Sequence, residues 1–142
     1  MIKILVADRE EAFCLMYQDE LTEEGYEVVS VTRPEAFLKA VEKENPDLVL
    51  MDSEMDDPDV QRFLKGVMTS GYRVPGILCT TYSDSKEFCR SFADDIVMKS
   101  ASLDELKGKV RGILENRGEL ISPDISRVPV SDEAFLSARR GV

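Results

Sequence analysis

The sequence contains no histidine and no tryptophan, and it has only three cysteines among its 142 residues. The absence of histidine excludes Ser–His and Cys–His catalysis, histidine metal ligands and the donation of a phosphoryl group from the chain's own histidine. Cys14, Cys79 and Cys89 form no Cys-x-x-Cys pair. Cys14 and Cys79 lie in apolar segments, and we therefore interpret these two as small buried hydrophobic residues. The scattered cysteines indicate a reducing cytoplasm.

Long apolar runs are also missing, and no stretch approaches the length that crosses a membrane. The apolar run at residues 1–7 is too short for a signal peptide and leads directly into charged residues. Basic residues are outnumbered, with 18 Lys and Arg against 28 Asp and Glu, so that the net charge is -10. We expect a cytoplasmic chain without membrane insertion or direct nucleic-acid binding, and with a surface suited to cations and basic partners.

The order of apolar segments predicts five strands alternating with five helices. The strands are expected at residues 2–7, 26–31, 47–51, 77–80 and 96–98, and the helices at about 11–24, 32–44, 59–70, 83–93 and 102–118. The pairs Thr32 with Glu35 and Ser102 with Glu105 predict capping boxes at the second and fifth helices. Alternating units of this kind predict a three-layer α/β/α sandwich with a five-stranded parallel sheet of order 2-1-3-4-5.

The last part of the chain differs in character. Residues 1–118 are expected to form one domain, which suits the chain's 16.0 kDa, and residues 119–142 a tail with a linker and a possible short helix. The tail is too short for a helix-turn-helix unit, and it either docks or stays free. We therefore expect no DNA-binding unit after the domain.

Two acids stand at the ends of predicted strands. Asp52 follows the uniformly apolar run 48–51, and Asp8 ends the first strand. In the expected order, strands one and three are neighbours at the point where the chain direction reverses, which is where open α/β sheets bind ligands. Asp8 and Asp52 are therefore expected to flank one crevice.

Two further polar residues close the neighbouring strands. Thr80 ends the fourth strand and Lys99 ends the fifth, so both are expected in the same row as Asp8 and Asp52. The set offers a carboxylate nucleophile, a second acid for Mg²⁺, a hydroxyl donor and a fixed cation. These residue types suit phosphoryl transfer to an aspartate.

On four segments, residues 3–8, 46–52, 77–80 and 93–99, the chain resembles the receiver domains of bacterial two-component response regulators. The resemblance covers about residues 1–118. It implies a phosphorelay function, in which Asp52 is phosphorylated by a partner histidine kinase or phosphotransfer protein. It further implies that Lys99 and Thr80 contact the phosphoryl group, and that Mg²⁺ is held by Asp8, Asp52 and the backbone carbonyl of Glu54.

The same resemblance implies output through protein–protein contacts with a downstream effector, and it allows a homodimer. We expect no enzyme activity beyond self-phosphotransfer and autodephosphorylation. Two residues depart from the family pattern. Arg9 stands where a second acid usually binds Mg²⁺, and Ile96 lies near the usual position of an aromatic switch residue.

These departures support an alternative hypothesis, a phosphorylation-independent pseudo-receiver that acts as an interaction scaffold. In that version, Arg9 forms an ion pair with Asp52 and imitates one signalling state without metal. A third hypothesis is a small hydrolase with Asp52 as its nucleophile. Against it, the chain lacks the Asp-x-Asp motif, because Ser53 and Glu54 follow Asp52.

Overall fold

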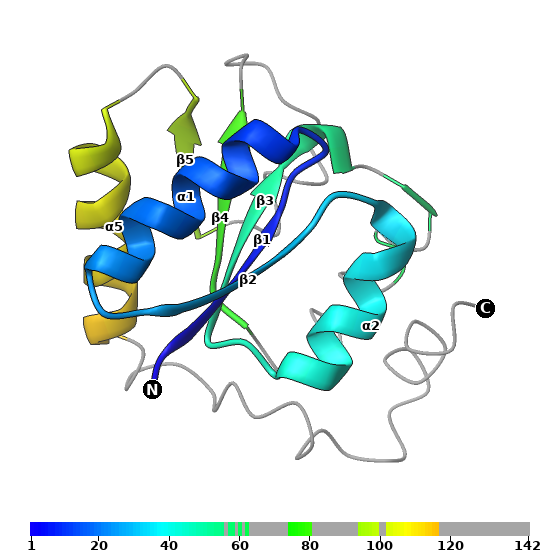
Figure 1. Ribbon diagram of the computed structural model, residues 1–142, viewed down its shortest axis with the longest axis horizontal. Helices are drawn as coiled ribbons and strands as arrows, with labels where there is room; N and C mark the ends of the chain where they lie inside the picture. Colours follow the sequence, from blue (N-terminus) through cyan, green and yellow to red (C-terminus); the bar gives the residue numbers. More distant parts are fainter. Residues whose placement is uncertain are drawn as a thin grey trace.

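The computed structural model describes residues 1–55, 57–58, 60, 62, 74–80, 94–99 and 102–116, with the backbone alone at residues 53, 78 and 80. The strands are β1 (Lys3–Ala7), β2 (Glu27–Val31), β3 (Leu48–Asp52), β4 (Gly76–Thr80) and β5 (Asp95–Met98). They form one parallel sheet of order β2-β1-β3-β4-β5 (Figure 1). The predicted sheet order is confirmed.

Three helices lie within the described residues. They are α1 (Glu11–Glu23), α2 (Pro34–Glu44) and α5 (Leu103–Asn116), and a 3-10 turn, η1 (Ser53–Met55), follows β3. The predicted helices at 59–70 and 83–93 lie almost entirely outside the described residues, as do the tail 119–142 and Cys89. No helix in the described part is long and apolar enough to span a membrane.

The helices cover opposite faces of the sheet, because strand side chains alternate between its two sides. On one face α1 and α5 pack on the sheet, and on the other lies α2 (Figure 1). The first face buries Tyr17 and Val110, and the second buries Phe37. Strand β3 is buried along its whole length, as the apolar run of residues 48–51 predicts.

The register of the strands decides where the polar strand ends meet. Ala7 of β1 pairs with Met51 of β3, so Asp8 and Asp52 come level as the two strands end. In the other half of the sheet, Asp52 pairs with Cys79 of β4. Three neighbouring strands therefore end at one edge with polar residues next to each other.

The helix ends confirm one predicted cap and contradict the other. The Ser102 hydroxyl accepts a hydrogen bond from the Glu105 N–H at 3.2 Å, as the second capping box predicts. The first capping box is wrong, because α2 begins after Arg33 without a side-chain cap. Pro34 starts that helix instead, since its fixed φ suits the first helical turn and it has no N–H to satisfy.

Candidate functional site

The centre of the site is one ammonium group between two carboxylates. The Lys99 Nζ lies 2.9 Å from Asp8 Oδ2 and 3.3 Å from Asp52 Oδ1. All three side chains are at most 3% exposed to solvent. Three separate segments of the chain thus meet in one buried ionic cluster, as the sequence predicts.

The backbone fixes the orientation of Asp8. Its Oδ1 accepts a hydrogen bond of 2.8 Å from the N–H of Glu10, two residues further on, which is the geometry of an Asx turn. Its Oδ2 forms an ion pair with Lys99. Within the described part of the chain, no donor has the geometry of a hydrogen bond to this oxygen. Asp8 therefore presents one buried oxygen that still has unused acceptor capacity.

The two carboxylates and the ammonium shift each other's pKa values. Burial raises the pKa of Asp52, and the nearby Asp8 carboxylate raises it further, while Lys99 and the Glu54 N–H oppose the shift. Burial by itself lowers the pKa of Lys99, but its contacts with Asp8 and Asp52 outweigh this effect and raise it. Burial is thus the main reason that the pKa of Asp52 rises, and the excess of two negative charges over one positive charge in the cluster adds to it.

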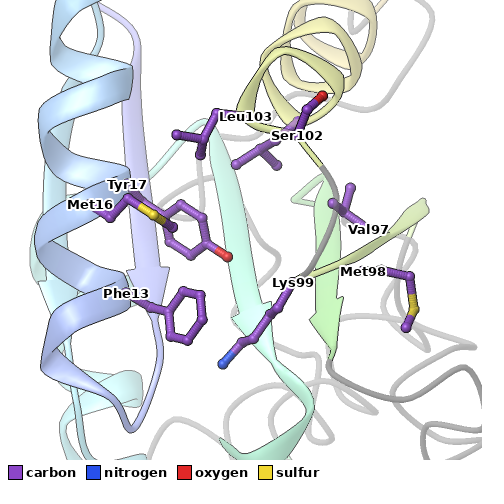
Figure 2. Close-up of a pocket in the computed structure, with 9 residues that line it drawn as sticks. Phe13, Met16, Tyr17, Val97, Met98, Lys99, Ser102 and Leu103 are labelled. Carbon is purple, nitrogen blue, oxygen red and sulfur yellow. The ribbon is translucent and has the colours of Figure 1, made fainter.

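One aromatic residue of α1, Phe13, supports Lys99, and it was not predicted as part of the site. The Lys99 Nζ lies 4.2 Å from the centroid of the Phe13 ring, within the range of a cation–π interaction. Phe13 in turn packs on Tyr17, with ring centroids 5.9 Å apart. Figure 2 shows the Phe13 ring beside the end of the Lys99 side chain, with Tyr17 further along α1.

The same rings border a cavity of about 100 Å³ between α1, the end of β5 and the start of α5 (Figure 2). The cavity begins beside Lys99 and is lined mainly by apolar side chains. Phe13 and Tyr17 are four residues apart and share the face of α1 that packs on the sheet, but their position near Lys99 depends on how α1 docks. Sequence patterns do not specify that docking.

Arg9 and Glu54 meet at the rim of the cluster. The Arg9 Nε donates a hydrogen bond of 2.7 Å to the backbone carbonyl of Glu54, 45 residues away in sequence. Both residues are exposed. Among the described residues no ion pair joins Arg9 to Asp52, so that detail of the pseudo-receiver hypothesis is wrong.

The remaining predicted site residues are placed only in part. The backbone of Thr80 ends β4, next to Met98 of β5, but its side chain is outside the described structure. Ile96 lies in β5 and is half-buried. Its carbonyl accepts a hydrogen bond of 3.0 Å from Lys109 of α5.

The donor set suits a hard cation incompletely. Asp8 and Asp52 provide carboxylate oxygens, and Asp8 Oδ2 is the buried oxygen without a hydrogen bond described above. The Glu54 carbonyl, which the resemblance gives as the third ligand, already accepts the Arg9 hydrogen bond. No group of three or more acidic, histidine or cysteine ligands occurs within the described residues.

Comparison with known proteins identifies the class to which this fold and site belong. The response regulator receiver domain matches residues 4–111, which is more than half of the chain. The chain belongs to the response regulator receiver domain family.

Several characterised proteins are similar to it. The alkaline phosphatase synthesis transcriptional regulatory protein PhoP of Bacillus subtilis is 33% identical over 126 residues, which cover 85% of this chain and 51% of PhoP. TrcR of Mycobacterium tuberculosis, a transcriptional regulatory protein, is 28% identical over 99% of this chain and 56% of its own length. This chain thus spans about half the length of these curated relatives.

Solved structures show the same fold. The response regulator TrrA of Thermotoga maritima, in complex with Mg²⁺-BeF, superposes with a TM-score of 0.67 and 34% identity, covering 80% of this chain and 99% of TrrA. The signal receiver domain of a LuxO repressor protein from Vibrio parahaemolyticus superposes with a TM-score of 0.70 and 18% identity, covering 83% and 93% of the two chains. The five-stranded flavodoxin-like arrangement is therefore that of the family.

Proposed function

We propose that this chain acts in phosphorelay signal transduction and that Asp52 is its phosphoacceptor. The donor is a phosphohistidine of a partner kinase or phosphotransfer protein. An Asp52 oxygen attacks phosphorus, the P–N bond breaks, and its electron pair returns to the imidazole nitrogen, which a solvent proton can neutralise. The product is an acyl phosphate on Asp52, which water later hydrolyses.

Lys99 carries the electrostatic part of this proposal. Its ammonium is held by Asp8 on one side and by the Phe13 ring on another, so its position is set before a phosphoryl group arrives. Preorganised charge of this kind stabilises the negative charge of a transferring phosphoryl group without rearrangement. Thr80 is proposed to hydrogen-bond the group afterwards, as the family resemblance implies.

Mg²⁺ is the proposed cofactor, with Asp8, Asp52 and the Glu54 carbonyl as its ligands. When bound, it would neutralise charge on the phosphoryl oxygens. TrrA, a relative of this chain, was solved with Mg²⁺-BeF, which supports the assignment.

The proposal also covers location and partners. We propose a cytoplasmic chain that modifies itself and turns over no external substrate, with output through contacts with a downstream effector protein. A homodimer is compatible with it. Direct nucleic-acid binding is not part of the proposed role, because the net charge of -10 repels phosphate backbones.

The observation that supports the proposal best is the double contact of Lys99 with Asp8 and Asp52 in a buried cluster. Acetyl phosphate with Mg²⁺ tests it. We expect intact-mass spectrometry to show one added phosphoryl group in the native chain and none in Asp52→Asn. Asp104→Asn, an exposed acid on α5, is the matched control and should be phosphorylated normally.

A native chain that remains unmodified beside a responsive receiver would contradict the phosphoacceptor role. That result would favour the pseudo-receiver scaffold, the second candidate function. The contact between Arg9 and Glu54 is the observation that favours this alternative, because it places a side-chain cation at the rim of the site.

A further inference from the structure

We infer that Arg9 is a tethered cation that occupies the Glu54 carbonyl and competes with divalent metal for the acidic cluster. The inference deepens the proposed function and rests on it for the identity of the site. It concerns how metal access is regulated by this chain's own residues, and it can be measured without any phosphoryl donor.

Glu54 lies between Arg9 and Asp52. Its carbonyl accepts the 2.7 Å hydrogen bond from Arg9, while its N–H donates to the Asp52 carboxylate. The turn after β3 is thereby tied both to the acceptor aspartate and to the loop after β1. A cation that uses this carbonyl as a ligand must first displace the guanidinium.

The charges of the site also oppose the binding of a divalent cation. Asp8 and Asp52 supply two negative charges, and Lys99 supplies one positive charge within 3.3 Å of both. Arg9 adds a second positive charge at the rim, so the four groups balance. A divalent cation entering this arrangement would create a surplus of two positive charges, which weakens its binding.

The cluster also keeps one unused hydrogen-bond acceptor. Asp8 Oδ2 is buried and has no hydrogen bond of normal direction among the described residues, although Lys99 lies 2.9 Å away. The Asp8 carboxylate can therefore still bind a metal while Arg9 occupies the Glu54 carbonyl. We infer that the site keeps two metal ligands and that Arg9 controls the third.

Mn²⁺ binding to the purified full chain tests this inference, measured by water-proton relaxation enhancement without phosphoryl donors. Arg9→Met removes the charge and the hydrogen bond, and we expect it to raise Mn²⁺ affinity about threefold. Arg9→Asp also adds a carboxylate ligand, and we expect a gain of at least about tenfold over the native chain.

Arg111→Asp is the matched control, since it makes the same charge change on α5, where Arg111 pairs with Glu24. It should bind Mn²⁺ within about twofold of the native chain, because screening reduces the effect of distant surface charge. Circular dichroism of each variant verifies folding, which we expect to persist because Arg9 is exposed.

The inference is supported if Mn²⁺ affinity is highest for Arg9→Asp, lower for Arg9→Met and lowest for the native chain, and if Arg111→Asp binds Mn²⁺ like the native chain. It is overturned if Arg9→Met binds no better than native, or if Arg111→Asp matches the gain of Arg9→Asp. A failure of phosphorylation at Asp52 would leave these affinities unaltered, so the two proposals fail separately.

Discussion

At the scale of single residues, the buried charge of Asp52 carries a cost in stability. It is a buried carboxylate that shares one ammonium with Asp8. Because burial and the Asp8 charge raise its pKa above the ordinary value of 3.8, the folded state holds the Asp52 proton more tightly than the unfolded state does. The resulting stabilisation is present below the ordinary pKa and is lost as pH rises through the raised one.

We therefore expect Asp52→Asn to increase the free energy of unfolding at neutral pH by about 1–2 kcal/mol, because it leaves a balanced pair of Asp8 and Lys99. The gain should shrink as pH falls towards the ordinary carboxyl pKa, where Asp52 is already protonated. Urea unfolding between about pH 4 and pH 8, with a chelator present to remove metal, measures it.

Lys99→Met provides the contrast. It leaves two buried carboxylates without their cation and should destabilise the fold by about 3–5 kcal/mol at neutral pH. The double variant with Asp52→Asn should be less destabilised than the sum of the two single changes predicts. If Asp52→Asn instead destabilised the chain at neutral pH, the account of the shared ammonium would be wrong.

The residues of the site differ in how far the sequence predicted them. Asp8, Asp52 and Lys99 stand at strand ends, and strand ends are readable from apolar runs followed by a charge. Arg9 was recognised only as a departure from the family pattern. Its predicted partner was Asp52, whereas the structure shows the Glu54 carbonyl. A long flexible side chain has many acceptors within reach, and the backbone turn at η1 decides which of them it meets.

At the scale of elements, the turn between α1 and β2 depends on Gly25. Its φ is +94°, a conformation that residues with a side chain rarely adopt, although a Cβ added there would meet no atom within 4 Å. The space is open, so any cost of substitution comes from the backbone alone.

We expect Gly25→Ala to lower the free energy of unfolding by about 1–2 kcal/mol. Gly108 lies inside α5 and also has open space around its Cβ position. Gly108→Ala is therefore the matched control and should stabilise the chain by about 0.5–1 kcal/mol. Thermal unfolding of both variants measures these changes. If both substitutions changed the stability by the same amount in the same direction, the backbone conformation of Gly25 would not explain the cost.

The helix ends show the limit of local patterns. Ser102 caps α5 as predicted, but Thr32 does not cap α2, although both have Glu three residues later. Pro34 begins α2, so the N-cap is Arg33, one residue beyond the predicted cap Thr32. The four-residue motif alone does not determine whether the N-cap of α2 is Thr32 or Arg33.

At the scale of the whole molecule, the dominant property is the net charge of -10. Mutual repulsion of this many negative charges destabilises the compact state, and added salt screens it. Raising NaCl from about 0.05 M to about 0.5 M should therefore raise the Tm, because the screening length shortens as the ionic strength rises.

Glu115→Lys, at an exposed position on α5, lowers the magnitude of the negative net charge by two, and this variant should show a smaller gain in Tm with salt than the native chain. Differential scanning fluorimetry at matched protein concentrations measures both. A Tm that does not respond to NaCl, or that falls, would show that local ion pairs such as Lys107 with Glu20, 2.7 Å apart, outweigh the overall repulsion.

The sequence by itself determined the strands, the parallel sheet of order 2-1-3-4-5 and the alignment of Asp8, Asp52 and Lys99 at one edge. Apolar periodicity and chain topology follow directly from residue order, and they are sufficient for these features. Only the tertiary structure decided that Phe13 supports Lys99 and that Arg9 holds the Glu54 carbonyl. These contacts join residues distant in sequence, and they depend on how α1 docks and how η1 turns once the sheet is formed.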